Sequence, residues 1–309
     1  MIQYLQAFYV ALAGAGLLAM PIYKWLLAIK SRQTVSQYAP EGHAKKQGTP
    51  TMGGLIIVAG TLISLIVCKK FNLAALFGGF TFIGFLDDFI VPRTMPGKRG
   101  LGWKQKLGLQ FLFAAGFGAI QGLGPTQIAV TVFVLLFFSN AYNFSDGLDA
   151  LAGSILIFLT LGIASIGLMF GQTEPVVVAV ALLGGVIPFL FLNAPPAKVF
   201  MGDTGSLPIG ALIGASVLQL GRIEDHTGPM VYLALTALSI MMIVELVPVP
   251  LQILSVKLRK KKLFPFTPIH HAFEKAGWPE SRVVWRFALV QLLCTAVAIS
   301  LAAYSFQSP

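Results

Sequence analysis

The stretch Thr81–Val91, TFIGFLDDFIV, is apolar over most of its length and carries two adjacent aspartates, Asp87 and Asp88, near its end. An apolar run of this kind favours a helix embedded in lipid, where ionised carboxylates are costly unless cations or hydrogen-bond donors accompany them. The two aspartates stand at the C-terminal end of their helix, where the helix dipole disfavours an anion, so helix capping does not explain them. They therefore indicate a functional site at the membrane boundary.

The rest of the chain has the composition of an integral membrane protein. Of its 309 residues, 56% are hydrophobic and only 11% are charged, and the mean hydropathy is +0.80. These values lie outside the usual range for a soluble globular domain. We therefore expect an all-α integral membrane protein in which residues 1–309 form a single domain.

Hydropathy predicts about ten transmembrane helices of roughly 20 residues each, with glycine, proline and charged residues marking their ends. The predicted ranges are residues 4–29, 53–69, 72–90, 106–122, 126–142, 148–170, 175–193, 206–220, 229–254 and 284–304. The ninth range contains Glu245 and the sequence VPVPLQ, so we expect this helix to be broken near Pro248 and Pro250.

Basic residues are unevenly divided between the two sides of the predicted membrane. Of the 22 lysines and arginines, all except Lys69, Lys70 and Arg222 fall in or beside the connections that follow odd-numbered helices. The positive-inside rule then places those connections in the cytoplasm and both termini outside. This bias and the attraction of anionic headgroups account for the net charge of +10, so nucleic acid is not needed as a partner.

Five aspartates on the predicted cytoplasmic face stand at or beside helix ends. Asp87 and Asp88 close the third helix, Asp146 and Asp149 join the fifth to the sixth, and Asp203 leads into the eighth. Carboxylates gathered at one membrane depth repel one another unless cations share the site, and either the basic loops or a hard divalent cation such as Mg²⁺ can supply them. For Asp149 and Asp203 a role as a helix cap or first-turn acid stays open.

Glycine-rich segments on the same face indicate phosphate binding. Each places small residues at a helix start, where free N–H groups can meet an anion, although none is a Walker A loop. The segments are GTPTMGG at 48–54, DGLDALAG at 146–153 and GDTGS at 202–206. Together with four lysines of the same face, these segments predict a pocket for a polyanionic, nucleotide-linked substrate. The lysines are Lys45, Lys46, Lys104 and Lys106.

Two adjacent histidines, His270 and His271, lie in the last polar loop. They can bind phosphate or act as acid or base, or they can be ordinary loop residues.

Together these motifs resemble the phospho-N-acetylmuramoyl-pentapeptide transferase family, the MraY translocases, within the polyprenyl-phosphate N-acetylhexosamine-1-phosphate transferase superfamily. The motifs occur in the family's order and are KKQGTPTMGG, GFLDDFI, LGWKQKL, SNAYNFSDGLDALAG, FLNAPPAKVFMGDTGSL and PIHHAFEKAGWPESRVVWRF. The resemblance implies a Mg²⁺-dependent enzyme of the bacterial cytoplasmic (inner) membrane, with its active site facing the cytoplasm. It would transfer phospho-MurNAc-pentapeptide from UDP-MurNAc-pentapeptide to undecaprenyl phosphate, giving lipid I and UMP. A homodimer is usual for the family.

The resemblance also implies roles for individual residues. Asp203 is the implied Mg²⁺ ligand, and Asp87, Asp88, Asp203 and His270 are the implied catalytic residues, with Asp87 as a base toward the lipid phosphate. The implied substrate-binding residues are Lys46, Thr51, Lys104, Asn143, Asp146, Gly147, Asp149, Asn193, Phe200 and His271. Among them, Phe200 would stack on uracil and Lys104 would sit by the phosphates. The chain departs from the family at Val91, Ala150 and Ala272, where lysine, glycine and histidine are usual.

Two alternatives stay open. A sister enzyme would use UDP-N-acetylglucosamine with the same lipid phosphate, although TPIHHAFE followed by GWPE is more similar to the muramoyl-pentapeptide branch. An ion-coupled transporter would place acids near the middle of the membrane. In this chain only Glu245 is a candidate for such depth, and no internal repeat supports a transporter built from two halves.

Overall fold

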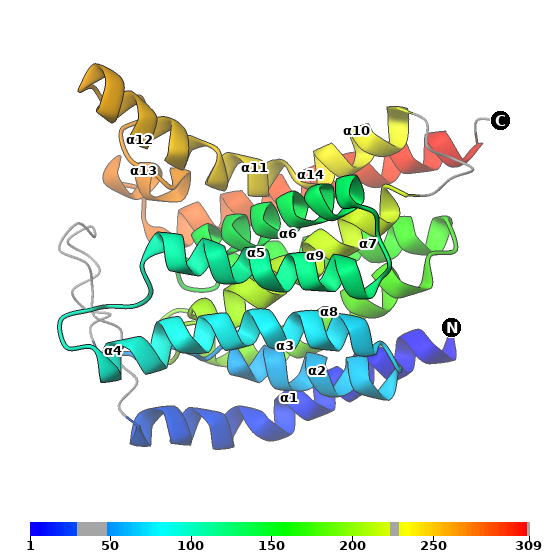
Figure 1. The fold of residues 1–309 in the computed structure, drawn as a ribbon, viewed down its shortest axis with the longest axis horizontal. Helices are drawn as coiled ribbons and strands as arrows, with labels where there is room; N and C mark the ends of the chain where they lie inside the picture. Colours follow the sequence, from blue (N-terminus) through cyan, green and yellow to red (C-terminus); the bar gives the residue numbers. More distant parts are fainter. Residues whose placement is uncertain (30–47, 223–228, 308–309) are drawn as a thin grey trace.

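The computed structural model describes residues 1–29, 48–222 and 229–307, and the regular elements among them are helices (Figure 1). In chain order they are α1 (Ile2–Ala28), α2 (Leu55–Val67), α3 (Phe71–Phe85), the π-helix η2 (Leu86–Ile90), α4 (Val91–Thr94), α5 (Trp103–Ile120), α6 (Pro125–Ser145), α7 (Leu151–Met169), α8 (Thr173–Asn193), α9 (Asp203–Leu220), α10 (Pro229–Leu238), α11 (Ile240–Leu246), α12 (Pro248–Arg259), α13 (Ile269–Lys275) and α14 (Glu280–Gln307).

Within the described residues, 7 helices are long and apolar enough to cross a membrane, judged by length and composition. They are Ile2–Ala28, Phe71–Thr94, Pro125–Ser145, Leu151–Met169, Thr173–Asn193, Ile240–Arg259 and Glu280–Gln307, and Leu55–Val67 and Pro229–Leu238 are shorter apolar helices. The expected all-α membrane protein is therefore confirmed. Each of the ten predicted ranges lies largely on helix, but the crossing of a membrane by all ten stays a prediction.

The ninth predicted range is broken, as expected, and it is broken twice. The first interruption is at Ser239, between α10 and α11, and the second is at Val247, directly before Pro248. Proline at the start of α12 lacks the N–H that would continue the hydrogen-bond ladder of α11. After this break, α12 projects away from the helix bundle, with α13 beside it (Figure 1).

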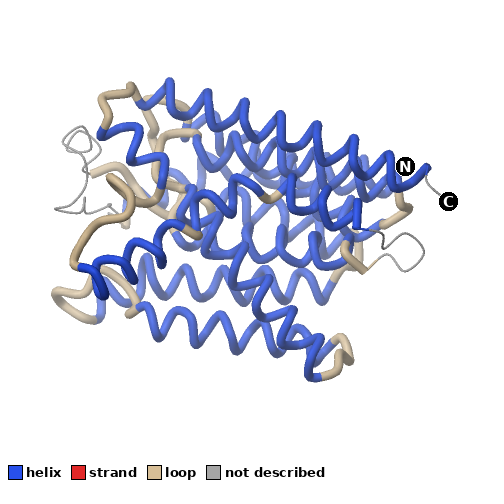
Figure 2. Tube along the Cα trace, turned by 90° about the horizontal axis from the view of Figure 1, so that it is seen from above, coloured by secondary structure: helices blue, strands red, loops and turns tan. Residues whose placement is uncertain are grey.

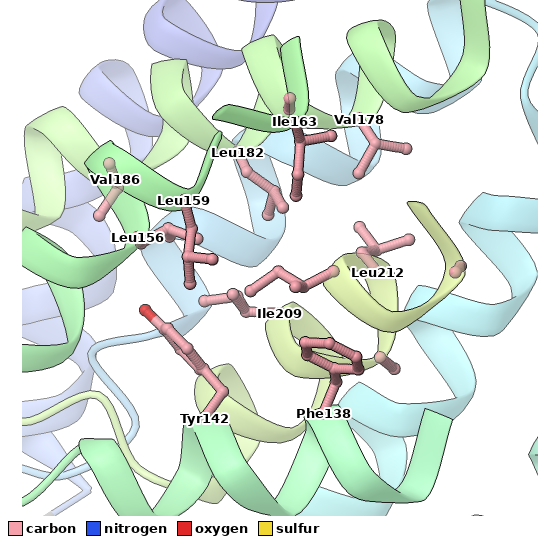
Figure 3. Packing of buried hydrophobic residues seen from close by; sticks show 14 of the residues in the cluster. Phe138, Tyr142, Leu156, Leu159, Ile163, Val178, Leu182, Val186, Ile209 and Leu212 are labelled. Atoms are coloured by element: carbon pink, nitrogen blue, oxygen red, sulfur yellow. The ribbon is translucent and has the colours of Figure 1, made fainter. Parts of the chain in front are cut away.

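The core lies between α6, α7, α8 and α9. Figure 3 shows Phe138 and Tyr142 of α6 facing Ile209 of α9, with leucines of α7 and α8 completing the cluster, and these side chains are almost wholly buried. Inside a bilayer such packing stabilises helix association through close van der Waals contact rather than by removing apolar surface from water. The core thus holds the helices whose ends form the site.

A row of small residues packs α1 against α2 and α8. Ala7, Ala11 and Ala15 are fully buried along one face of α1. A Cβ on Gly60 of α2 would lie 2.3 Å from the carbonyl oxygen of Ala11, and a Cβ on Gly184 of α8 would lie 2.5 Å from that of Phe8. The three backbones therefore approach closely, as small residues permit in membrane helices.

The helices run side by side, and the connecting segments gather at the two ends of the bundle (Figures 1 and 2). Both termini lie at one end, and α4 lies at the other. Lys69, Lys70 and Arg222, the three basic residues predicted for one side, line a single cavity of about 450 Å³ before the start of α3. Asp87 and Asp88 follow the opposite end of α3.

Candidate active site

A π-helical segment presents the two adjacent aspartates. The α-helical pattern of α3 ends at Phe85, and Leu86–Ile90 forms η2 with Asp87 and Asp88 in its first turn. Pro92 follows. A proline in a regular α-helix clashes with the carbonyl four residues earlier, here that of Asp88, and cannot donate a hydrogen bond to it. Single π-turns of this kind are frequent at functional sites. Both aspartates are half-buried.

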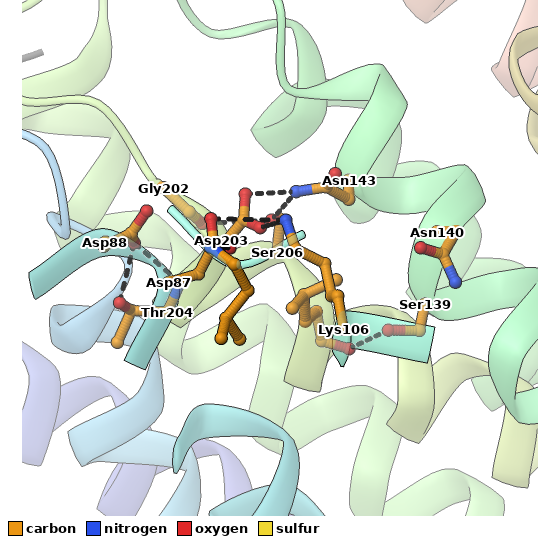
Figure 4. Close-up of polar contacts among 12 residues, drawn as sticks. Asp87, Asp88, Lys106, Ser139, Asn140, Asn143, Gly202, Asp203, Thr204 and Ser206 are labelled. Atoms are coloured by element: carbon orange, nitrogen blue, oxygen red, sulfur yellow. Dashed lines mark hydrogen bonds and ion pairs between the residues drawn. The ribbon is translucent and has the colours of Figure 1, made fainter. Parts of the chain in front are cut away.

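Asp203 completes a cluster of three carboxylates (Figure 4). One oxygen each of Asp87, Asp88 and Asp203 lies within 4.8 Å of the others, so the predicted convergence of these acids is confirmed. Asp203 is the first residue of α9, and the preceding Gly202 has φ +71, a conformation that favours glycine. Gly84 of α3 brings the two helices together, because a Cβ there would lie 2.2 Å from the carbonyl oxygen of Asp203.

Lys106 of α5 joins two of the three acids. Its Nζ lies 2.5 Å from Oδ2 of Asp203 and 3.2 Å from Oδ2 of Asp87. The other oxygen of Asp87 accepts a hydrogen bond of 2.8 Å from the backbone N–H of Leu101. Gly100 packs directly on this carboxylate, since a Cβ there would lie 2.8 Å from Oδ2. One lysine therefore offsets part of the charge that Asp87 and Asp203 bring together.

Asp88 caps a helix, although not the one on which it lies. Its Oδ2 accepts hydrogen bonds from the backbone N–H and the hydroxyl of Thr204, at 2.9 and 2.7 Å, at the N-terminus of α9. The exclusion of a capping role was therefore wrong for Asp88, because it considered only the helix that carries the residue. The positive end of the α9 dipole stabilises this carboxylate.

Asn143 of α6 orients the third acid. Its Nδ2 donates to Oδ1 of Asp203 at 2.7 Å and to Oγ of Ser206 at 2.8 Å (Figure 4). Ser206 in turn donates to the carbonyl of Gly202 at 3.0 Å. Asn143 thus belongs to the carboxylate cluster, and Asp203 has the first-turn position in α9 that the sequence left open.

The Asp146–Ala150 turn joins α6 to α7 and is tied to several distant elements. The N–H of Asp149 donates to Oε1 of Glu280 at 2.6 Å, and Oδ2 of Asp149 accepts from the N–H of Ala197 at 3.0 Å. The N–H of Ala150 donates to Oδ1 of Asn193 at 2.9 Å, while Nδ2 of Asn193 donates to the carbonyl of Val199 at 2.9 Å. Asn193 therefore uses both ends of its amide on backbone groups.

The glycine-rich segment before α2 lies against the segment before α9. Backbone hydrogen bonds link Phe200 to Pro50 and Gly53, at 2.9 and 2.7 Å, and they place Thr51 at this junction. A Cβ on Gly202 would lie 2.7 Å from Oγ1 of Thr51 and 2.6 Å from Oδ2 of Asp88. Thr51 and half-buried Phe200 are therefore neighbours of the carboxylate cluster. Lys45 and Lys46, the predicted phosphate-binding lysines of this segment, lie outside the described residues.

The two histidines differ in their surroundings. His270 is fully buried on α13, and its Nδ1 lies 2.8 Å from Oε2 of Glu245, which is also fully buried. Nδ1 of His271 lies 2.6 Å from Oε2 of Glu274 on the same helix, and this pair is partly exposed. His270 contacts the turn at Gly147, where a Cβ would lie 2.2 Å from Nε2. The described contacts place His270 at that turn and not among the three carboxylates.

The cluster of Asp87, Asp88 and Asp203 has the chemistry of a site for a hard cation. Carboxylate oxygens from three positions are the ligands that Mg²⁺ and Ca²⁺ take, and no sulfur or imidazole stands among them. The set fits Mg²⁺ better than an all-protein Ca²⁺ cage, because Mg²⁺ uses few carboxylates and leaves positions for water and phosphate.

Sequence reasoning missed several contacts of the site. Lys104 and Lys106 were both predicted for the phosphate pocket, and Lys106 contacts the acids. Lys104 is exposed, with its Nζ 5.5 Å from the ring centre of Trp103, and its place beside the phosphates stays a prediction. The hydrogen bonds between Asp88 and Thr204 were not predicted, and Glu245 was named without its partner His270. Glu280 is the first residue of α14, whereas the sequence placed it in the last polar loop, before the predicted helix 284–304.

Comparison with known proteins shows which family the chain is similar to. Residues 70–221 match the model of glycosyl transferase family 4, and residues 46–58 match phospho-N-acetylmuramoyl-pentapeptide-transferase signature 1. The chain is 36% identical to the phospho-N-acetylmuramoyl-pentapeptide-transferase of Moorella thermoacetica, over 95% of this chain and 98% of that protein. Identity to the enzymes of the same name from Carboxydothermus hydrogenoformans and Aliarcobacter butzleri is 34%, over 95% of this chain and 96% and 92% of theirs.

Proposed function

The chain belongs to the phospho-N-acetylmuramoyl-pentapeptide-transferase family, and we propose that it transfers phospho-MurNAc-pentapeptide from UDP-MurNAc-pentapeptide to undecaprenyl phosphate. The products are lipid I and UMP, and the reaction belongs to peptidoglycan synthesis. The main structural support for this function is the cluster of Asp87, Asp88 and Asp203, in which Lys106 forms ion pairs with Asp87 and Asp203.

The reaction brings two anionic phosphates together, so the site has to offset their repulsion. Lys106 contributes a fixed positive charge between Asp87 and Asp203, and the N-terminus of α9 contributes the positive end of its dipole. A phosphate monoester is largely ionised near neutrality, with a second pKa of about 6. Proton removal from the lipid phosphate is therefore a small part of the barrier, and Asp87 serves mainly to orient the site, with positioning supplying much of the rate.

Mg²⁺ is the cofactor we propose, held by Asp203 together with Asp87 and Asp88. When bound, it supplies Lewis-acid stabilisation of charge on phosphate oxygens. Asn143 fixes the orientation of the Asp203 carboxylate, and Leu101 fixes that of Asp87, so both carboxylates are held before a ligand arrives. This support favours a built site over a chance grouping of acids.

We place the nucleotide sugar at the Asp146–Ala150 turn, with Thr51 and Phe200 on its other side. Phe200 is half-buried beside Thr51, which is compatible with one exposed ring face for uracil. Asn143 belongs to both regions, because it leads from the carboxylate cluster to Asp146 at the end of α6. Asn193 supports this turn through its backbone hydrogen bonds.

We further propose that the site faces the cytoplasm from the bacterial inner membrane. The support is the charge bias of the sequence, because Lys69, Lys70 and Arg222 share the end of the bundle opposite the aspartates. The hydrocarbon tail of undecaprenyl phosphate would follow α12, which leaves the bundle after Val247 and exposes a run of large apolar side chains. These are Leu251, Ile253, Leu254 and Leu258, which are 42, 64, 51 and 70% exposed.

The deciding experiment offers purified protein undecaprenyl phosphate and Mg²⁺ with either UDP-MurNAc-pentapeptide or UDP-N-acetylglucosamine. We expect UMP release and a new lipid-linked product with the first nucleotide sugar only. A reaction without the lipid phosphate is the control for simple hydrolysis. Turnover of UDP-N-acetylglucosamine instead would identify the sister activity, and turnover of neither would overturn the proposed function.

A further inference from the structure

Glu245 and His270 form a buried hydrogen-bonded contact between α11 and α13. Glu245 lies on α11 directly before the break, and His270 lies on α13, which follows the last polar loop. Both side chains are 0% exposed, and Nδ1 of His270 lies 2.8 Å from Oε2 of Glu245. Within the described part of the chain, Oε1 of Glu245 and Nε2 of His270 are buried without a hydrogen-bond partner. Unsatisfied buried groups of this kind are costly and call for an explanation.

The imidazole of His270 presses on the turn between α6 and α7. A Cβ on Gly147 would lie 2.2, 2.9 and 3.2 Å from Nε2, Cε1 and Cδ2 of His270, and these are the nearest atoms that it would meet. Only glycine therefore fits at position 147 while the ring holds this orientation. Because Nδ1 is bonded to Glu245, the ring cannot rotate away without breaking that hydrogen bond.

The turn that His270 contacts is held in a strained conformation. Ala150 has φ +65, a left-handed conformation that costs a residue with a Cβ about 1 kcal/mol or more. Hydrogen bonds with three other segments hold the same turn: Asn193 and Glu280 accept from its N–H groups, and Ala197 donates to its Asp149. Strained backbone persists where its surroundings over-determine it, and such places cluster at functional sites.

We propose that Glu245 and His270 are a positioning pair. Together they fix where the backbone of the Asp146–Ala150 turn lies against the bound nucleotide sugar. This inference rests on the proposed function, in which the turn binds that substrate. Glu245 fixes the ring by Nδ1, and the edge of the ring carrying Nε2 fixes the backbone at Gly147. A side chain with no exposed surface cannot touch the reacting atoms, so His270 is assigned here as a positioning residue and not as a catalytic residue.

The first test separates binding from chemistry. Glu245→Ala removes the partner of Nδ1, and we expect the KM for UDP-MurNAc-pentapeptide to rise about tenfold to a hundredfold, because misplacement of a binding group has effects of that order. The KM for undecaprenyl phosphate should stay within twofold. Glu245→Gln keeps an oxygen that can accept from Nδ1–H and should restore most of the affinity. A loss confined to kcat, equal in Glu245→Ala and Glu245→Gln, would overturn the proposal.

The matched control is Glu174→Ala, which removes a carboxylate from a different contact, the ion pair with Lys70 at 2.9 Å. Glu174 is near the start of α8, and Asn193 is the last residue of that helix, so about 28 Å of helix separates the two. We expect both KM values of this variant to match those of the unmodified protein.

The second test uses the contact at Gly147 directly. Gly147→Ala should raise the KM for the nucleotide sugar about tenfold or more in the unmodified protein, because its Cβ collides with the ring. In a Glu245→Gln, His270→Ala background the colliding atoms are gone, and adding Gly147→Ala should change the KM by less than twofold. Equal fold changes in the two backgrounds would show that the two positions are uncoupled and would overturn the proposal.

Hydrogen exchange gives a readout that does not need turnover. Amides of residues 146–151 should exchange faster in Glu245→Ala than in the unmodified protein or in Glu174→Ala, and unchanged exchange at this turn would contradict the proposal even if a Gly147 variant fails to fold. Failure of the proposed function is recognised separately. It would appear as absence of UMP release by the unmodified protein, whereas failure of the positioning pair would leave that activity intact.

Discussion

The ammonium nitrogen of Lys106 lies 2.5 Å from Oδ2 of Asp203, although 97 positions of the chain separate the two residues. The same nitrogen lies 3.2 Å from Oδ2 of Asp87. One cation from α5 thus joins acids that arrive from the end of α3 and the start of α9, and this contact is the centre of the site.

Replacing Lys106 should disable the site without unfolding the protein. Lys106→Gln leaves Asp87 and Asp203 facing each other without the cation, and we expect kcat for UMP release to fall about a hundredfold. Thermal unfolding should be shifted by only a few degrees, because the lysine is partly exposed. Lys104→Gln is the informative comparison. A larger loss from Lys104→Gln than from Lys106→Gln would mean that the exposed lysine serves the phosphates.

Mg²⁺ should stabilise the folded protein through the three carboxylates. A ligand at a hundred times its Kd adds about 2.7 kcal/mol to the free energy of unfolding. We therefore expect added Mg²⁺ to raise the melting temperature of the unmodified protein and of Glu174→Gln, and to lose this effect in Asp203→Asn. Differential scanning calorimetry in detergent measures it. Equal shifts in Asp203→Asn and the unmodified protein would place the cation elsewhere.

Gly84 should tolerate no side chain. A Cβ there would lie 2.2 Å from the carbonyl oxygen of Asp203 and 2.4 Å from the backbone nitrogen of Thr204, and backbone atoms cannot move aside cheaply. Gly84→Ala should therefore reduce lipid I synthesis about a hundredfold by displacing the start of α9. Gly78→Ala on the same helix is the control, since a Cβ there meets nothing within 4 Å. It should keep full activity and raise stability by about 0.5–1 kcal/mol.

Replacing Ala150 by glycine should stabilise the folded protein. Its left-handed backbone favours glycine, which is also the residue usual in the family, so Ala150→Gly should raise the free energy of unfolding by about 1 kcal/mol. Gly171→Ala makes the reverse change at φ +66 where a Cβ meets no neighbour, and it should lower stability by about the same amount. Reversible unfolding in mixed micelles measures both. A destabilised Ala150→Gly would mean that the turn relaxes when its ligand is absent.

The helices and the convergence of the acids could be predicted from the sequence because both follow from local signals. A bilayer imposes a length on each apolar run, and acids at the ends of such runs share a depth. The selection of Lys106 over Lys104 could not be predicted in the same way. The two lysines stand about 200° apart around α5, so they point to opposite sides, and which side meets α9 depends on packing between helices.

Contacts between distant helix ends could not be predicted either. Asp88 caps α9 at Thr204, 116 positions away, and no local sequence pattern indicates such a partner. The pairing of Glu245 with His270 is similar, since both residues attracted attention singly and only the fold brings α11 to α13. The first interruption of the ninth range, at Ser239, was not predicted, because no proline or glycine stands beside it in the sequence.

The small-residue face of α1 bears on how the protein is made. α1 leaves the ribosome well before α8, one of its two closely packed partners, which begins only at Thr173. Until α8 is synthesised, α2 can cover one side of the alanine row of α1, and the side that α8 later covers faces lipid. Biogenesis of this protein should therefore include a late step in which an early inserted segment is enclosed, and substitutions along the alanine row should reduce the yield of assembled protein before they reduce its turnover.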